Sequence, residues 1–285
     1  MDRAHAMQLV QSFEGGLLTR REFLTRATVV LGSAAAANTV LAACRVGPGS
    51  EPGPAVAPEL KAPPPGVTPG LGPEEGLRIE DVAYTDAQGE DLAAYLARPD
   101  ADGALPGVVV IQEWWGLDDH IKDVVRRFAR AGFVAMAPDL YHGVVVDEPN
   151  EARKLLMDLD TDAAVQEIRR AVAYLSSRDD VALPAVGIVG FCMGGGLVLQ
   201  TTLEEDRVAA AVAFYGRPLT ADEAPRAKAP ILGLYGAKDR GISAAQVSKM
   251  ESAFDASGLA GEFHTYEGAG HAFFNDTRSS YDGKA

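Results

Sequence analysis

Cysteine is scarce in this 285-residue chain, with one residue at position 44 and one at position 192. Two cysteines in such different sequence surroundings exclude a disulfide-rich scaffold. No group of His, Cys, Asp or Glu has metal-ligand spacing, no P-loop occurs, and no Gly-x-Gly-x-x-Gly follows the first predicted strand. The sequence therefore predicts neither a metal nor a cofactor.

Basic side chains are also few, since 26 Lys and Arg stand against 40 Asp and Glu, for a formal net charge of -14. A surface this acidic repels phosphate backbones, which argues against a nucleic-acid partner. With 47% hydrophobic and 23% charged residues, the composition is that of a globular protein rather than a disordered, collagen-like or multi-pass membrane protein.

The first 43 residues resemble a twin-arginine export signal. Arg20 and Arg21 precede an uncharged, alanine-rich run over residues 27–43, and Leu-Ala-Ala followed by Cys44 resembles a bacterial lipoprotein box. The resemblance implies that residues 1–43 are removed and that a lipid on Cys44 is the only link to a membrane, at a periplasmic or cell-surface location. The alternative is an ordinary N-terminal amphipathic helix followed by a chance cysteine.

A linker is predicted to separate this signal from the folded body. Residues 47–73 contain nine Pro and six Gly, which disfavour regular helix or sheet, so residues 44–76 are assigned to the linker. The remaining residues, 77–285, are enough for one well-packed domain.

Strand and helix patterns alternate along this domain. Two half-buried strand patterns over residues 77–84 and 92–97, separated by turn residues, favour an antiparallel hairpin. Later strands are predicted over 107–111, 133–137, 186–189, 208–214, 231–235 and 262–266, and helices over 120–131, 150–158, 161–177, 194–203 and 243–256. Such alternation predicts an α/β fold with a mostly parallel central sheet and helices on both faces.

Residues 190–194 read Gly-Phe-Cys-Met-Gly, between a strand pattern and a helix pattern. This is the Gly-x-nucleophile-x-Gly pattern of a nucleophile elbow, with Cys192 where serine is usual. Glycine is needed two positions on either side because a Cβ there would clash in the tight turn. The following helix N-terminus would favour a thiolate and a developing oxyanion. The alternative is a structural Gly-rich turn with a buried, inert cysteine.

An acid and a histidine follow the elbow. Asp239 lies in the loop after the strand pattern 231–235, and His271 lies in a Gly-rich loop after the last strand pattern. Each could by itself be a plain loop residue. The order Cys192, Asp239, His271 is nucleophile, acid, base, which is the order that α/β-hydrolases use, so together the three predict a catalytic triad.

The domain resembles the dienelactone hydrolase (carboxymethylenebutenolidase) family of α/β-hydrolases. The matching stretches are IQEWWG (111–116), APDLY (137–141), GFCMGG (190–195), YGAKD (235–239) and GHAF (270–273). The resemblance implies hydrolysis of small-molecule esters or lactones through the Cys-His-Asp triad and a thioester. It also implies a second catalytic carboxylate, Glu113, and an oxyanion hole made of the backbone N–H groups of Met193 and Trp114.

Four residues are candidates for substrate binding: Trp115, Tyr141, Arg153 and Arg278. Trp115 could instead cap the core, and Tyr141 could belong to a structural turn. The two arginines are the nearest replacements for family arginines that hold a substrate carboxylate. One of those positions falls at Pro149 and the other at Asn275, four residues past His271, so the substrate is less defined than the chemistry.

The end of the chain departs from the family pattern. It stops at Ala285, whereas the family closes with a further helix, so either this copy is truncated or the helix is lost. In both cases we expect an apolar strip to be exposed. His120 is interpreted as an ordinary surface or helix-cap residue. The alternative function, a non-catalytic surface lipoprotein that keeps an α/β-hydrolase shell for ligand binding, depends on the missing helix and the replaced arginines.

Overall fold

The structure, a computed structural model, describes residues 74–85, 89–182 and 186–285. The predicted export signal, Cys44 and nearly all of the predicted linker lie outside these residues. Within the described residues, no helix combines the length and the apolar character that crossing a bilayer requires.

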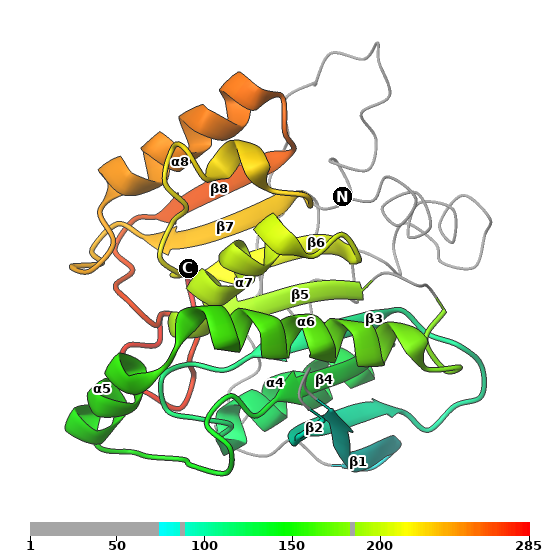
Figure 1. Cartoon of the computed structure of the whole chain (residues 1–285). Helices are drawn as coiled ribbons and strands as arrows, with labels where there is room; N and C mark the ends of the chain where they lie inside the picture. The colour runs from blue at the N-terminus through cyan, green and yellow to red at the C-terminus, as the bar shows by residue number, and fades with distance from the viewer. Residues whose placement is uncertain (1–73, 86–88, 183–185) are drawn as a thin grey trace.

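Eight strands form one sheet in the order β1-β2-β4-β3-β5-β6-β7-β8 (Figure 1). The strands are Leu77–Thr85 (β1), Asp91–Pro99 (β2), Gly107–Ile111 (β3), Val134–Pro138 (β4), Val186–Phe191 (β5), Val208–Phe214 (β6), Ile231–Gly236 (β7) and Gly261–Tyr266 (β8). β2 pairs antiparallel with both β1 and β4, and the other neighbouring strands pair in parallel. The predicted N-terminal hairpin and the mostly parallel sheet are confirmed.

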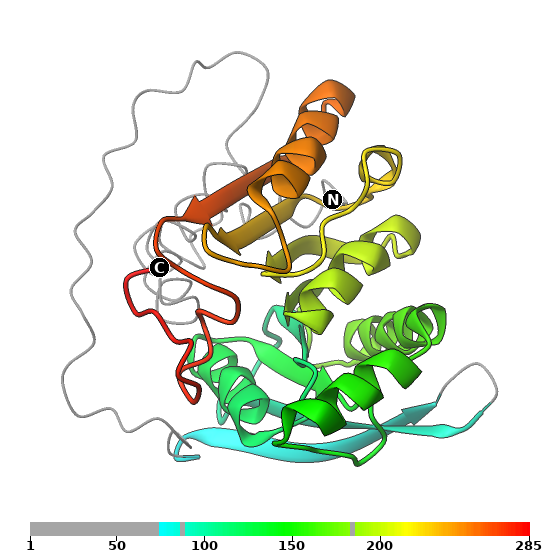
Figure 2. The ribbon, with the colours of Figure 1, turned by 90° about the vertical axis from the view of Figure 1, so that its left-hand side faces the viewer.

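Helices cover both faces of the sheet (Figure 2). The helices are α4 (Asp119–Arg130), α5 (Pro149–Asp158), α6 (Thr161–Ser177), α7 (Met193–Glu204) and α8 (Ala244–Ser257), with a short 3-10 turn η1 (Ala224–Arg226). Apolar side chains of α6, α7 and α8 share one buried cluster, and those of α4 belong to a second cluster on the opposite face. β3 and β4 are buried along their whole length, because parallel strands covered on both sides present apolar side chains to two layers.

The parallel strands all end at one edge of the sheet, on the left of Figure 1. The loops that follow β3, β5, β7 and β8 therefore gather there. They carry Glu113, Cys192, Asp239 and His271, respectively. Ligands of open α/β sheets bind at this carboxyl edge, so the fold positions the four predicted residues where a site is expected.

Residues 267–285 follow β8 as a series of turns, with no helix among them. This C-terminal segment runs back along the α4 side of the sheet (Figure 2), where Phe273 is buried and Phe274 packs against the same cluster. Leu232 and Leu234 of β7 are buried in that cluster too. The prediction of an exposed apolar strip is therefore wrong, because the C-terminal segment covers this part of the sheet although it is not helical.

Candidate functional site

Cys192 lies in the turn between β5 and α7, with φ 54° and ψ −116°. A positive φ strains a residue that carries a Cβ, and such strain is found at nucleophile elbows. A Cβ on Gly190 would lie 2.3 Å from the carbonyl oxygen of Gly194, and one on Gly194 would lie 2.4 Å from that of Gln112. The predicted need for glycine at both positions is confirmed.

Cys192, His271 and Asp239 meet at the carboxyl edge. Nε2 of His271 lies 3.1 Å from the sulfur of Cys192, and Nδ1 lies 2.7 Å from Oδ2 of Asp239. Oδ1 of Asp239 accepts hydrogen bonds from the backbone N–H groups of Gly241 (2.8 Å) and Ile242 (3.1 Å). Because both carboxylate oxygens are bonded, Asp239 has a fixed direction and favours the ring tautomer with the proton on Nδ1 and Nε2 free to accept from the thiol.

The three side chains differ in their access to solvent. The Asp239 side chain is 1% exposed, whereas that of His271 is 40% exposed. A cleft of about 360 Å³ adjoins these two residues and is lined also by Lys238 and Arg240. Cys192 does not line this cleft, so the cleft opens the imidazole rather than the sulfur to water.

Opposing effects act on the thiol of Cys192. Burial raises its pKa to about 12, and the negative charges of Glu113 and Asp239 contribute to the rise. Backbone hydrogen bonds from Met193 and Trp114 act in the opposite direction because they stabilise a thiolate. Two backbone donors thus point at the sulfur, beside the position where an oxyanion would form.

Glu113 follows β3, and its side chain is buried at the same edge. Nδ2 of Asn275 donates to its Oε2 at 2.5 Å, and the Tyr215 hydroxyl donates to its Oε1 at 3.3 Å. Burial raises the pKa of Glu113, while electrostatic attraction by His120 and the hydrogen bond from Asn275 oppose the rise. Within the described part of the chain, Glu113 makes no hydrogen bond to the thiol of Cys192.

Three of the four predicted substrate-binding residues lie close to parts of the site. Tyr141 is buried, and its hydroxyl donates to the sulfur of Met193 at 3.2 Å, directly beside the elbow. Burial, followed by the charge of Cys192, raises the pKa of Tyr141 to about 12. The guanidinium carbon of Arg278 lies 3.9 Å from the ring centroid of Trp115, so these two candidates stack on each other.

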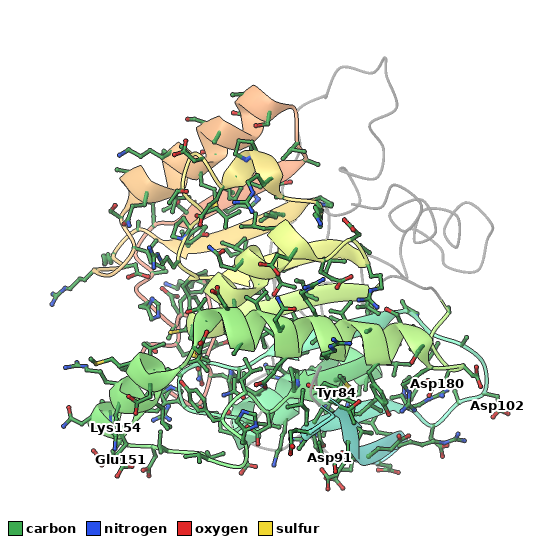
Figure 3. The ribbon with its side chains drawn as sticks, viewed as in Figure 1. Tyr84, Asp91, Asp102, Glu151, Lys154 and Asp180 are labelled. Atoms are coloured by element: carbon green, nitrogen blue, oxygen red, sulfur yellow. The ribbon has the colours of Figure 1, made fainter. Side chains whose placement is uncertain are left out.

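Arg153 is the candidate that the structure does not bring to the others. It lies on α5, a helix in which only Ala152 is buried. Glu151 and Lys154, its neighbours on α5, point into solvent (Figure 3). No hydrogen bond or ion pair joins Arg153 to another residue of the described ranges, so its predicted role has no contact to support it.

Sequence reasoning missed Tyr215 and misjudged His120. Tyr215 follows β6, is fully buried at φ 39°, and its ring lies edge-on to His271 with centroids 5.1 Å apart. Its position directly after a central parallel strand, at the edge where ligands bind, was the sequence signal that could have identified it as a site residue. His120 is not a surface residue but 3% exposed, and its Nδ1 lies 3.3 Å from Oδ1 of Asp276.

These groups form a set suited to nucleophilic acyl transfer. Cys192 is a free thiol with a hydrogen-bonded base, and the base is oriented by a buried carboxylate. Two backbone N–H groups converge at the sulfur. Among residues 74–85, 89–182 and 186–285, no three His, Cys, Asp or Glu side chains are grouped to hold a metal ion.

Comparison with known proteins gives a consistent family. Residues 92–285 match the model described as "Dienelactone hydrolase family". A "Putative carboxymethylenebutenolidase" of Escherichia coli is 37% identical over 223 residues, which cover 68% of this chain and 78% of the relative. A protein of the same description from Methylorubrum extorquens is 36% identical over 205 residues, covering 67% and 70%.

Solved structures agree with the sequence relatives. The crystal structure of a "Putative Dienelactone Hydrolase" from Klebsiella pneumoniae superposes with a TM-score of 0.65 at 34% identity, covering 72% of this chain and 92% of that one. A dienelactone hydrolase-like promiscuous phosphotriesterase from metagenomic libraries gives a TM-score of 0.66 at 26% identity, covering 73% and 91%.

Proposed function

The chain belongs to the dienelactone hydrolase family, and on that premise we propose that it hydrolyses small-molecule esters or lactones with Cys192 as the nucleophile. One observation carries the proposal. The imidazole of His271 is hydrogen-bonded to the sulfur at 3.1 Å through one nitrogen and to Asp239 at 2.7 Å through the other. This is the relationship that a nucleophile, a base and an orienting acid require.

The first half of the reaction forms a thioester. His271 accepts the thiol proton at Nε2 while the sulfur attacks the carbonyl carbon, and Asp239 stabilises the imidazolium that results. The N–H groups of Met193 and Trp114 donate to the oxyanion, and loss of one such donor typically costs about 10²–10³ in rate. The intermediate then expels the alcohol oxygen, which takes the proton from His271.

The second half consumes water. His271, whose side chain is 40% exposed, is accessible to a water molecule and accepts its proton at Nε2. The hydroxide attacks the thioester carbonyl, the thiolate of Cys192 leaves, and it recovers the proton from His271. One ester bond and one water yield one acid and one alcohol, or a single hydroxy acid from a lactone.

Glu113 is assigned to the resting state of the thiol. Its charge is among the causes that raise the pKa of Cys192, which keeps the sulfur protonated until substrate is bound. A direct hydrogen bond from Glu113 that draws the thiol away from His271 is not the arrangement observed, because its carboxyl oxygens are bonded to Asn275 and Tyr215. Glu113 therefore acts on the sulfur through its charge.

The alternative of a non-catalytic binding shell is not favoured. That alternative depended in part on a missing helix that would leave the sheet uncovered. The C-terminal segment instead packs against the apolar cluster on the α4 side of the sheet. A binding shell also has no need for a thiol hydrogen-bonded to an oriented imidazole. The missing carboxylate-binding arginines at Pro149 and Asn275 bear on the substrate and leave this chemistry unaffected.

The proposal is tested by trapping the acyl-enzyme. A panel of chromogenic esters, thioesters and lactones identifies a substrate, and rapid acid quenching followed by peptide mass spectrometry locates the acyl group. We expect the acyl mass on the peptide that contains Cys192. Turnover without any adduct, and at an unchanged rate in Cys192→Ala, would overturn the proposal.

We also propose that residues 1–43 direct export by the twin-arginine route and that Cys44 is lipidated. The paired Arg20 and Arg21 and the Leu-Ala-Ala-Cys sequence support this. Replacing both arginines by lysine should retain the protein in the cytoplasm, whereas Arg26→Lys, a matched change outside the pair, should not. Cys44→Ser should release exported protein from membranes, and unchanged fractionation of these variants would contradict the proposal.

A further inference from the structure

Asn275 is a fully buried polar residue in the turn that follows His271. Its Nδ2 donates to Oε2 of Glu113 at 2.5 Å. Its Oδ1 accepts from both the backbone N–H (3.0 Å) and the hydroxyl (2.6 Å) of Thr277. Both ends of the amide are bonded, so its orientation is set by the hydrogen bonds and the N–H₂ group must face the carboxyl group of Glu113.

The next residue fixes the backbone at this position. Asp276 accepts from Arg127 of α4 at 2.5 Å through Oδ2, and its Oδ1 lies 3.3 Å from Nδ1 of the buried His120. Arg127 is itself bonded to Asp123 at 2.6 Å. A segment tied to α4 by a half-buried ion pair cannot shift without breaking that pair, so Asn275 is held at a fixed place beside Glu113.

We propose that Asn275 is a positioning residue, whose amide holds the carboxyl group of Glu113 against Tyr215 and off the sulfur of Cys192. This inference rests on the proposed role of Cys192. The hydroxyl of Tyr215 bonds the other oxygen of Glu113 at 3.3 Å, and the thiol keeps His271 as its partner at 3.1 Å. An amide donor carries no charge, so it stabilises the carboxylate without cancelling the negative charge that the sulfur experiences.

The groups around Glu113 act in both directions on its ionisation. Burial and the charge of Asp118, at the start of α4, favour the protonated form, whereas His120, Asn275 and Tyr215 favour the carboxylate. Burial is the largest of these effects, so the carboxylate depends on its donors. Without the Asn275 donor, Glu113 takes up a proton more readily, and the thiol loses a neighbouring negative charge.

The test is the pH dependence of thiol alkylation by iodoacetamide in the full chain. We expect Glu113→Gln to lower the apparent pKa of the Cys192 thiol by about one unit, since it removes a nearby charge. Asn275→Leu should shift it in the same direction by about half a unit or more. The double variant should match Glu113→Gln, because Asn275 acts through Glu113.

Matched variants separate this role from a general loss of structure. Ser280→Ala removes a side-chain hydrogen bond to Ala272 in the same segment and should leave the profile unchanged. Tyr215→Phe removes the other hydrogen bond to Glu113, together with the one that the hydroxyl accepts from the backbone of Phe274. It should lower the apparent pKa as Asn275→Leu does, which keeps the test available if Asn275→Leu does not fold.

Two outcomes would overturn the inference. One is an unshifted profile in Asn275→Leu, or in Tyr215→Phe where Asn275→Leu does not fold; the other is an Asn275→Leu shift that persists in full in the Glu113→Gln background. Alkylation reports on the sulfur whether or not it is the nucleophile. If the alkylation test fails but Cys192→Ala loses ester turnover, only the positioning role of Asn275 is rejected. Undiminished turnover in Cys192→Ala would instead remove the proposed function.

Discussion

The sulfur of Cys192 lies 3.1 Å from Nε2 of His271, although the two residues are 79 positions apart in the chain. The contact arises because β5 and β8 run parallel and end at the same edge of the sheet. Since burial raises the pKa of the Cys192 thiol to about 12, the sulfur carries its proton in the resting enzyme at neutral pH. A nucleophile then forms only when His271 takes the proton as the sulfur attacks.

Replacing the nucleophile tests this relationship first. Cys192→Ala should lower kcat/KM for a short nitrophenyl ester by about 10³-fold or more, because it removes the thiol that is hydrogen-bonded to His271. Initial rates by absorbance give the measurement. Cys44→Ala is the same chemical change at the other cysteine and should leave the rate unchanged; equal loss in both variants would contradict the assignment.

Asp239→Asn tests the orienting acid. Asparagine can keep the carbonyl oxygen that accepts from Gly241 and Ile242, but it presents N–H₂ to Nδ1 of His271. The ring must then carry its proton on Nε2 and can no longer accept one from the thiol. We expect kcat to fall by about 10⁴ with little change in KM.

The matched control for that variant is Asp255→Asn, an exposed acid on α8 that makes no contact with the site. Steady-state kinetics of the two variants on one ester suffices. A kcat loss of less than about tenfold in Asp239→Asn would show that His271 does not need this partner.

The elbow and the order of the triad could be predicted because each depends on short stretches of sequence. Glycines at fixed spacing mark the strained turn at Cys192, and apolar runs mark the strands whose ends carry Asp239 and His271. The parallel arrangement then follows from alternation of strands and helices. The local patterns, together with the parallel sheet expected from the alternation, were therefore enough to predict that these residues meet at one edge of the sheet.

The surroundings of Glu113 could not be predicted in this way. Its partner Asn275 is 162 positions away, and Tyr215 is 102 positions away, so both pairs depend on side-chain packing rather than on a local pattern. His120 has the sequence context of a surface helix start, yet the C-terminal segment buries it beside Asp276. The C-terminal segment is built of turns, and turns have no periodic hydrophobic pattern from which its packing could be predicted.

The pairing of Asp276 predicts an acid-dependent loss of stability. The interactions with His120 and Arg127 outweigh burial and lower the pKa of Asp276 from 3.8 to about 2. A carboxyl whose folded-state pKa is depressed contributes stability above its unfolded pKa, and the contribution is lost as the pH falls through its folded pKa. Asp276→Asn should therefore lower the free energy of unfolding at pH 7 by about 1–2 kcal/mol.

Urea denaturation of wild type and Asp276→Asn between pH 7 and pH 2 gives the measurement. The difference in unfolding free energy should be constant down to about pH 4 and shrink between about pH 4 and pH 2. Asp222→Asn, at an exposed position, is the control and should show no such difference. A difference that persists at pH 2 would mean that Asp276 stabilises the fold by something other than its charge.

Gly194 and Gly196 provide a paired test of the close packing at the elbow. A Cβ on Gly194 would lie 2.4 Å from the backbone oxygen of Gln112 and 2.6 Å from that of Ile111, which only a backbone shift could relieve. Gly194→Ala should therefore reduce the free energy of unfolding by about 3 kcal/mol and displace the elbow. In Gly196→Ala the nearest atom, the backbone nitrogen of Arg217, would lie at 3.4 Å.

The two variants make the same chemical change two residues apart in the first turns of α7, so helix propensity cancels between them. Gly196→Ala gains propensity of about 0.5–1 kcal/mol and should unfold at an equal or higher denaturant concentration than wild type, with ester turnover retained. Gly194→Ala should lose both stability and turnover, because the N–H groups around Cys192 move with the turn. Equal stability of the two variants would mean that the backbone just after β3 can shift at Gln112, and that the space at position 194 does not require glycine.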